Sequence, residues 1–135
     1  MKKSTFLLAV VTALSLILTA CGGSGPTTDL KVDLTDFAFS PNKFTVPAGQ
    51  VITFTATNSG AVVHEFIIMK YDTTVGKDYG EEDIPNIYWK VEVEPGGSVT
   101  TTFIAPSQAG DYQVVCGTPG HFMAGMVATL TVAAP

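Results

Sequence analysis

The sequence of 135 residues contains no arginine, two cysteines, two histidines and one tryptophan. Charged side chains make up only 14% of it, and the formal net charge is −5. An acidic chain without arginine is a poor match for the polyanionic backbone of DNA or RNA, so we expect no nucleic-acid partner. Two cysteines permit one disulfide at most, which excludes a small fold held together by a disulfide framework.

An uncharged and largely apolar run extends from Phe6 to Ala20, and it follows Lys2 and Lys3. Its 15 residues are too few to span a bilayer comfortably. A basic start followed by such a run is typical of a secretory signal. The run ends at Cys21, with small residues before it and Gly-Gly-Ser-Gly-Pro after it, which resembles the lipobox of bacterial lipoproteins.

We therefore expect residues 1–20 to be a lipoprotein signal peptide, residues 21–28 to be a lipidated Cys21 with a flexible tether, and residues 29–135 to be one folded domain. The alternatives are an ordinary signal peptide with a chance cysteine, or an uncleaved anchor. Two or more acyl chains suffice for stable attachment. The expected location is thus a bacterial membrane, with the exported domain facing the periplasm or the cell exterior.

Cleavage before Cys21 would leave 115 residues, with five lysines against twelve acidic residues and a net charge of −7. Such a charge favours basic partners. With Cys21 committed to lipid and Cys116 to the site described below, no disulfide is expected.

The remaining sequence contains no helical period and no repeat. It contains short runs of strand-forming residues bounded by Pro, Gly and Asn. The predicted strands are 30–39, 43–46, 50–57, 62–70, 87–94, 98–104, 111–116 and 126–132. Residues 71–86 are polar and acidic and are predicted to form a loop with a short helical turn at most. Short strands at this spacing predict an all-β Greek-key sandwich or barrel.

The strongest signal is the stretch from Cys116 to Met126, which contains His121 and lies on a turn between two predicted strands. Thiolate and thioether are soft ligands that select copper, and imidazole suits copper as well. A second histidine, His64, lies far upstream. Two histidines, one cysteine and one weakly bound methionine are the ligand set of a blue-copper electron-transfer site.

Strand periodicity tests this assignment, because residues two apart in a strand share one face of the sheet. His64, Cys116 and Met126 each share a face with apolar residues, so all three are predicted to point into one end of the core. Met69 faces the other side of its strand, and Met123 lies on a tight turn beside His121. Taken singly, each of these residues would more often be core filler or a satisfied surface group. Together they favour a metal site with Met126 as its axial ligand.

The turn itself contains Pro119-Gly120, which is suited to a sharp reversal. The pattern Cys-x4-His-x4-Met, with an upstream His after Asn-Ser-Gly and a preceding Gly-Asp-Tyr-x3-Cys strand, resembles the cupredoxins of the plastocyanin/azurin type. The resemblance covers about residues 29–133. It implies an antiparallel β-sandwich of about eight strands that holds one type 1 copper ion, cycling between Cu(I) and Cu(II). The ligands that it implies are His64, Cys116, His121 and Met126.

One residue departs from the pattern. Much of the family has Asn after the upstream histidine, where this sequence has Glu65. A carboxylate cannot donate a hydrogen bond as an amide does, but it could accept one from Thr118 or from a backbone N–H. Its charge near the site would favour the oxidised ion. The alternative is a solvated glutamate on the outward face of the strand.

A closed ligand set leaves no position for a substrate, and no further histidine remains for a second copper site. We therefore expect a monomeric electron carrier rather than an enzyme. The uncharged Pro119, Gly120, Phe122 and Met123 are expected to surround His121 as a docking patch for redox proteins. In the alternative, Phe122 and Met123 turn into the core.

The acidic run 78–83 is expected to steer a basic partner, such as a cytochrome c or a membrane oxidoreductase complex, towards this domain. The alternative is a solvated loop without that role. A second function remains open, which is copper handling by storage, delivery or resistance. Proteins of that kind tend to have Met-rich or His-rich tracts, and this sequence has four methionines.

Overall fold

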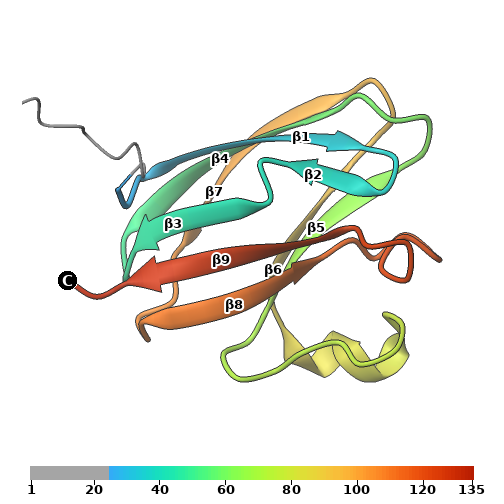
Figure 1. Ribbon diagram of the computed structural model, residues 1–135. Helices are drawn as coiled ribbons and strands as arrows, with labels where there is room; N and C mark the ends of the chain where they lie inside the picture. The colour runs from blue at the N-terminus through green and yellow to red at the C-terminus, as the bar shows by residue number, and fades with distance from the viewer. Residues whose placement is uncertain (1–24) are drawn as a thin grey trace, which may run out of the picture.

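The computed structural model describes residues 25–135, so the predicted signal peptide and Cys21 lie outside the described residues. Within them, nine strands form two sheets packed face to face (Figure 1). The first sheet has the order β2-β1-β4-β7 and consists of β1 (Asp29–Thr35), β2 (Ala38–Ser40), β4 (Val51–Asn58) and β7 (Ser98–Ile104). The second has the order β3-β9-β8-β5-β6 and consists of β3 (Lys43–Pro47), β5 (His64–Met69), β6 (Ile87–Val93), β8 (Gly110–Val115) and β9 (Val127–Ala133).

This architecture confirms the predicted all-β sandwich of about eight strands. Most neighbouring strands are antiparallel, but β1 pairs with β4 in parallel, and β3 pairs with β9 in parallel. Parallel pairing requires a crossover connection. The chain provides one by crossing from the first sheet into β3 and then returning to β4, which lies beside β1.

The prediction of one strand over residues 30–39 was wrong. The chain reverses at Asp36 and Phe37, so that β2 folds back antiparallel on β1 with Thr35 opposite Ala38. Phe37 has a φ of 69°, a left-handed backbone conformation that is uncommon outside glycine. No Gly, Pro or Asn marks this turn in the sequence, and it was therefore not recognised.

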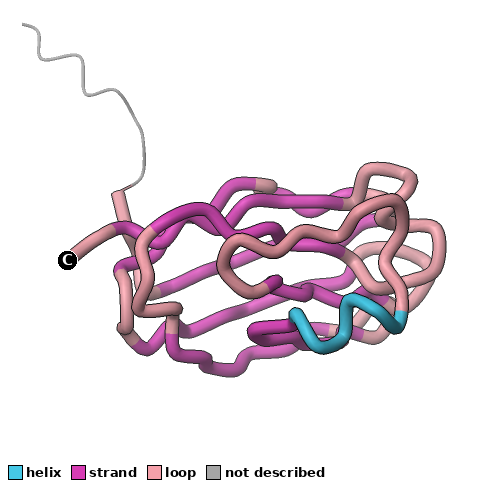
Figure 2. The backbone as a smooth tube through the Cα atoms, turned by 90° about the horizontal axis from the view of Figure 1, so that it is seen from below, coloured by secondary structure: helices cyan, strands magenta, loops and turns pink. Residues whose placement is uncertain are grey.

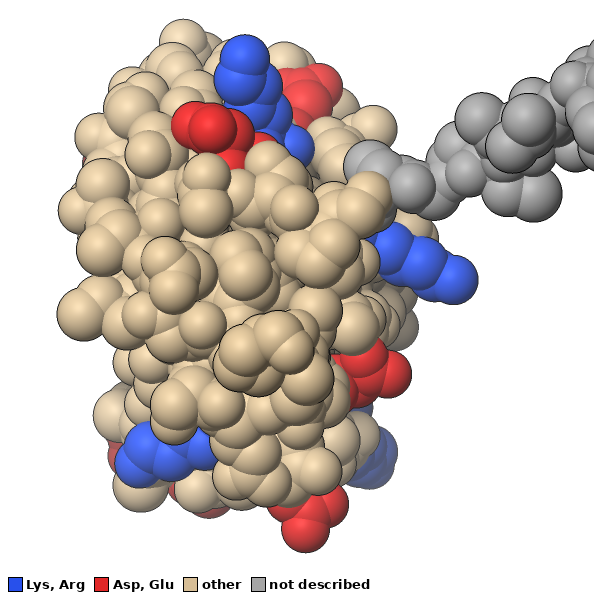
Figure 3. Space-filling view, turned by 90° about the vertical axis from the view of Figure 1, so that its left-hand side faces the viewer, with Lys and Arg blue, Asp and Glu red and all other residues tan. Residues whose placement is uncertain are grey.

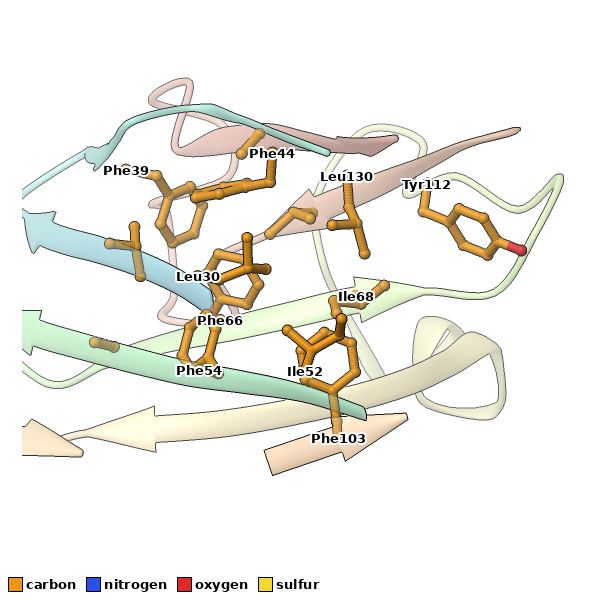
Figure 4. Packing of buried hydrophobic residues seen from close by; sticks show 14 of the residues in the cluster. Leu30, Phe39, Phe44, Ile52, Phe54, Phe66, Ile68, Phe103, Tyr112 and Leu130 are labelled. Carbon is orange, nitrogen blue, oxygen red and sulfur yellow. The ribbon is translucent and has the colours of Figure 1, made fainter. Parts of the chain in front are cut away.

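Alternate residues of the strands fill the space between the two sheets (Figure 4). Phe66 of β5 is completely buried at the centre of an aromatic group. Its ring centroid lies 5.4 Å from that of Phe39, 5.6 Å from that of Phe44 and 4.7 Å from that of Phe54. Tilted and edge-on contacts of this kind add to the free energy gained by burial alone.

A second, smaller cluster covers the opposite face of the five-stranded sheet. Ile67, Met69, Val75 and Val115 are buried there, and Phe122 packs against them. The segment between β5 and β6, which includes the 3-10 helix η1 (Glu81–Asn86), runs across this face (Figure 2). As a result β5 is buried on both of its faces, and Met69 points away from the main core, as predicted.

The two ends of the sandwich differ. The described chain starts at the end where β1 begins, and the loop between β8 and β9 lies at the opposite end (Figure 1). Regular backbone bonding begins at Thr27, whose N–H donates to the Thr45 carbonyl at 3.0 Å, two residues before the predicted domain start. None of the helices found in residues 25–135 has the length and apolar character needed to cross a bilayer.

Candidate metal centre

Cys116 and Met126 lie side by side at one end of the five-stranded sheet. Cys116 directly follows β8 and Met126 directly precedes β9, and the Cys116 N–H donates to the Met126 carbonyl at 3.2 Å. Both side chains are completely buried in the main core. The antiparallel pairing of the two strands thus brings a thiol and a thioether, ten positions apart, to one place.

The loop between them folds back on itself through a series of tight turns. The His121 N–H donates to the Thr118 carbonyl at 3.0 Å, and the Met126 N–H donates to the His121 carbonyl at 2.9 Å. Gly120 and Gly125 have φ values of 80° and 95°, in the left-handed region that favours glycine. These two residues allow the loop to turn sharply enough to return His121 to Cys116.

His64 is brought to the same end by the connection between β4 and β5. Asn58 organises this connection from inside: its side-chain amide donates to the carbonyls of Val62 and Val93, both at 2.8 Å, and accepts from the Gly60 N–H at 2.8 Å. Sequence reasoning treated Asn58 only as a turn residue. Its burial and its three bonds show that it also fixes where β5 begins.

The donor atoms of His64, Cys116 and His121 all lie within 4.8 Å of one another. The Cys116 Sγ is 3.8 Å from Nδ1 of each histidine, and the centroids of the two imidazole rings are 5.0 Å apart. His64 and Cys116 are inaccessible to solvent, and His121 is 7% exposed. One thiol and two imidazole nitrogens that converge in an apolar core fit a metal ion with a preference for sulfur and nitrogen ligands.

The electrostatics of His64 agree with this fit. Burial lowers the pKa of His64 below its ordinary value, and the proximity of His121 lowers it further, while Asp36 acts in the opposite direction. The neutral imidazole is therefore favoured. Only this form has an unprotonated nitrogen with which to bind a metal.

Glu65 and Thr118, the two other candidates near the ligands, do not bond to each other. The Thr118 hydroxyl donates to the Val63 carbonyl at 2.7 Å, and Glu65 Oε1 accepts from Lys90 Nζ at 2.8 Å. Glu65 is thus on the outward face of β5, as in the alternative considered from sequence, but its side chain is only 15% exposed. A Cβ at Gly117 would collide with the Glu65 carboxylate, so this carboxylate packs directly against the backbone beside Cys116.

Two residues that sequence reasoning missed contact the histidines from the turn between β1 and β2. The Phe37 ring centroid lies 4.9 Å from that of His121, and Asp36 Oδ1 lies 3.3 Å from His64 Nε2. No motif pointed to them, because they were placed inside one continuous strand. Only the unusual backbone turn at Phe37 brings both side chains to the site.

The surface around His121 is largely apolar. Pro119 and Gly120 are exposed, Met123 is 64% exposed, and Phe37 is 53% exposed beside the His121 ring. Phe122, in contrast, is half-buried against the second cluster. Met123 is therefore exposed, as expected for the docking patch, whereas Phe122 turns inward, as in the alternative considered from sequence.

Comparison with known proteins identifies the family. Residues 6–132 match the family model described as a cupredoxin-like domain. The chain belongs to the cupredoxin family. Auracyanin-A of Chloroflexus aurantiacus is 31% identical to this cupredoxin, in an alignment that covers 85% of this chain and 88% of the relative. The copper-resistant cuproprotein CopI of Rubrivivax gelatinosus is 29% identical, over 70% of this chain and 59% of the relative.

Solved structures agree with the sequence comparison. Reduced auracyanin from Roseiflexus castenholzii superposes with a TM-score of 0.68 and 31% identity, over 81% of this chain and 99% of that chain. Auracyanin A, described as a blue copper protein, gives a TM-score of 0.61 and 27% identity, over 78% of this chain and 99% of that chain. The cofactor of this cupredoxin is copper at a type 1 site, and the cluster of His64, Cys116 and His121 fits it.

Proposed function

We propose that this cupredoxin is a membrane-tethered one-electron carrier that holds its copper ion through His64, Cys116, His121 and Met126. The observation that supports this proposal best is the convergence of three buried donor atoms within 4.8 Å of one another. The blue copper relatives named above support the same function. Copper bound there would supply a one-electron couple between Cu(I) and Cu(II).

The protein's contribution is to hold the ligands still and to keep water out. His64 starts β5, Cys116 follows β8 and Met126 precedes β9, so each side chain is fixed by a strand of the same sheet. A set held in this way changes little when the oxidation state changes, which lowers the barrier to electron transfer. Both histidines of the sequence belong to the set, which favours a carrier over a copper enzyme with further His-rich sites.

We place the electron port at His121, which is 7% exposed, whereas His64 and Cys116 are inaccessible. The surface of Pro119, Gly120 and Met123, with Phe37 against the His121 ring, forms the proposed docking patch. Phe122, which was also expected in this patch, is half-buried against the second cluster. Brief docking of a redox protein suits a small apolar surface of this kind.

Absorption spectroscopy tests the copper site. The described domain loaded with Cu(II) is expected to show intense blue or green thiolate-to-copper absorption. Replacing Cys116 by serine removes the thiolate and is expected to abolish this absorption. Met69→Leu is the matched control, because that sulfur is buried on the opposite face of β5. A colourless wild-type protein with weak Cu(II) binding would contradict the proposal.

Fewer residues of the acidic run 78–83 are available to steer a basic partner than the sequence predicts. The Asp83 carboxylate is buried and accepts from the Gly80 N–H at 3.0 Å, at the start of η1. Asp83 therefore has a structural role, and Asp78, Glu81 and Glu82 are the exposed carboxylates of this run.

Neutralising Glu81 and Glu82 together is expected to slow reduction by a basic partner such as a cytochrome c at low ionic strength. The effect should fade as salt is added, because exposed charges are screened beyond about 10 Å at 0.1 M salt. Stopped-flow rates at two salt concentrations measure it, with Asp111→Asn at the other end of the molecule as the control. Equal rates at low salt would rule out steering by η1.

Membrane attachment through a lipid on Cys21 is part of the same proposal. The described chain begins at the end of the sandwich opposite the loop with His121 (Figure 1). Charged side chains are few and scattered over that end (Figure 3). Attachment there would direct the docking patch away from the membrane. Cys21→Ser is expected to release the exported protein from the membrane fraction of the cells that produce it.

Copper handling is the second candidate function, and the similarity to the copper-resistant protein CopI favours it. Transfer of Cu(I) to a soluble chelator distinguishes the two functions. A carrier should retain its copper through many cycles of reduction and oxidation, whereas a delivery protein should lose Cu(I) readily.

A further inference from the structure

The turn between β1 and β2 contacts both histidines of the metal centre through consecutive residues. Asp36 Oδ1 lies 3.3 Å from His64 Nε2, and the Phe37 ring lies against that of His121. These contacts are distinct from the ligand cluster. The Nδ1 atom of His64 faces the Cys116 sulfur, whereas Nε2, which faces Asp36, is on the other side of the imidazole ring.

His64 Nε2 needs a hydrogen-bond partner. Among the buried side-chain nitrogen and oxygen atoms of residues 25–135, it alone makes no hydrogen bond. Buried polar groups almost always have a partner, and an orphaned one costs free energy. When Nδ1 of an imidazole binds a metal, Nε2 carries the remaining proton and must donate it. The carboxylate of Asp36, 3.3 Å away, is placed to accept.

The surrounding backbone holds this carboxylate in position. The Ala61 N–H donates to Asp36, with the nitrogen 3.1 Å from Oδ1 and 3.4 Å from Oδ2. A Cβ on Gly60 would lie 2.5 Å from both Asp36 Oδ1 and His64 Nε2, closer than real side chains approach. Gly60 therefore leaves open the gap in which the carboxylate and the imidazole meet.

We propose that Asp36 is a positioning residue for copper. Its carboxylate accepts the Nε2–H of His64 and thereby fixes the tautomer in which Nδ1 is free for the metal. A carboxylate on the far nitrogen of a metal-binding histidine orients the ring and makes it a more basic ligand. The inference rests on the proposed role of His64 as a copper ligand.

Cu(II) affinity, measured by competition with a chelator, tests this role. Asp36→Ala is expected to bind Cu(II) about 10- to 100-fold more weakly than the wild type. Asp36→Asn should lose less, because its amide oxygen still accepts the Nε2–H. Asp111→Ala is the matched control: Asp111 carries the same charge and accepts one hydrogen bond, from Thr131 at 2.7 Å, at the other end of the sandwich.

Two further readouts separate positioning from a purely structural role. The reduction potential of Asp36→Ala should rise, because the oxidised ion loses more from the missing carboxylate than the reduced ion does. The ring ¹⁵N shifts of His64 in the Cu(I) protein should show Nε2 protonated in the wild type and a changed environment in Asp36→Ala. If Asp36→Ala does not fold, the same measurements are made on Asp36→Asn and Gly60→Ala. Gly60→Ala should weaken Cu(II) binding and raise the reduction potential, because its Cβ would push the Asp36 carboxylate away from His64.

Equal Cu(II) affinity, potential and ¹⁵N shifts in Asp36→Ala and Asp111→Ala would overturn the inference. Loss of stability in Asp36→Ala with all three readouts unchanged would overturn it as well. These outcomes leave the proposed function intact as long as the wild-type protein is coloured by copper. A colourless wild type would instead contradict the proposed function itself.

Discussion

At the scale of single residues, the four proposed ligands could be found from sequence because their chemistry is rare in this chain. With only two histidines and two cysteines, the choice was narrow, and strand periodicity placed His64, Cys116 and Met126 on inward faces. Asp36 and Asn58 could not be found in this way. Acidic and amide side chains in turns are common, and only the folded backbone brings these two to the start of β5.

Met126, rather than Met123, is the methionine that would complete the copper ligands in the proposed site. Met126 is completely buried beside Cys116, whereas Met123 is 64% exposed. Met126→Leu removes a thioether that would stabilise Cu(II) more than Cu(I), so the reduction potential is expected to rise. The thiolate-to-copper absorption should persist, because Cys116 is unchanged. Met123→Leu should leave the potential unchanged. Cyclic voltammetry of the two variants measures the difference, and an equal shift in both would show that the assignment is wrong.

At the scale of elements, strands with strict alternation were predicted well. In β4 the residues Ile52, Phe54 and Ala56 are buried and the intervening threonines lie on the other face, as the pattern indicates. The turn at Asp36 and Phe37 was missed because Phe37 does not favour a reversal and no Gly, Pro or Asn lies beside Asp36. The position of η1 could not be predicted from sequence either, because its polar residues show no periodicity. It is held by Lys70, just after β5, whose backbone N–H donates to the Asn86 carbonyl and whose Nζ donates to the Pro85 carbonyl.

The loop between β8 and β9 gives a prediction at the scale of elements. Gly120 has a φ of 80°, and a Cβ there would meet nothing within 4 Å, so the cost of a side chain arises from the backbone alone. Gly120→Ala is expected to lower the free energy of unfolding of the metal-free protein by about 1–2 kcal/mol. Gly76→Ala, in open space without a positive φ, is the control and should change it by less than about 0.5 kcal/mol. Urea denaturation measures both, and equal effects would contradict the prediction.

At the scale of the whole molecule, stability depends on the aromatic group between the sheets. Phe66 is completely buried and contacts three other rings, so Phe66→Ala leaves a cavity and removes these contacts. We expect a loss of about 3–5 kcal/mol in the free energy of unfolding. Phe37→Ala is the matched control, because Phe37 is 53% exposed and its loss should cost much less. A similar loss in both variants, measured by urea denaturation, would argue against this account of the core.

The first described residues and the ligand loop lie at opposite ends of the sandwich. The length of the sandwich therefore separates the copper site from a membrane to which the first residues are attached. β1 has 7 residues and runs from one end of the sandwich towards the other. At about 3.3 Å per residue, it spans roughly 23 Å. If Cys21 carries a lipid, an upright domain resting on the membrane would hold its copper at least that far above the lipid headgroups, and the tether of residues 21–28 would add to this height. A partner embedded in the same membrane would then have to extend to a similar height, whereas a freely diffusing partner would reach His121 from above without contacting the membrane.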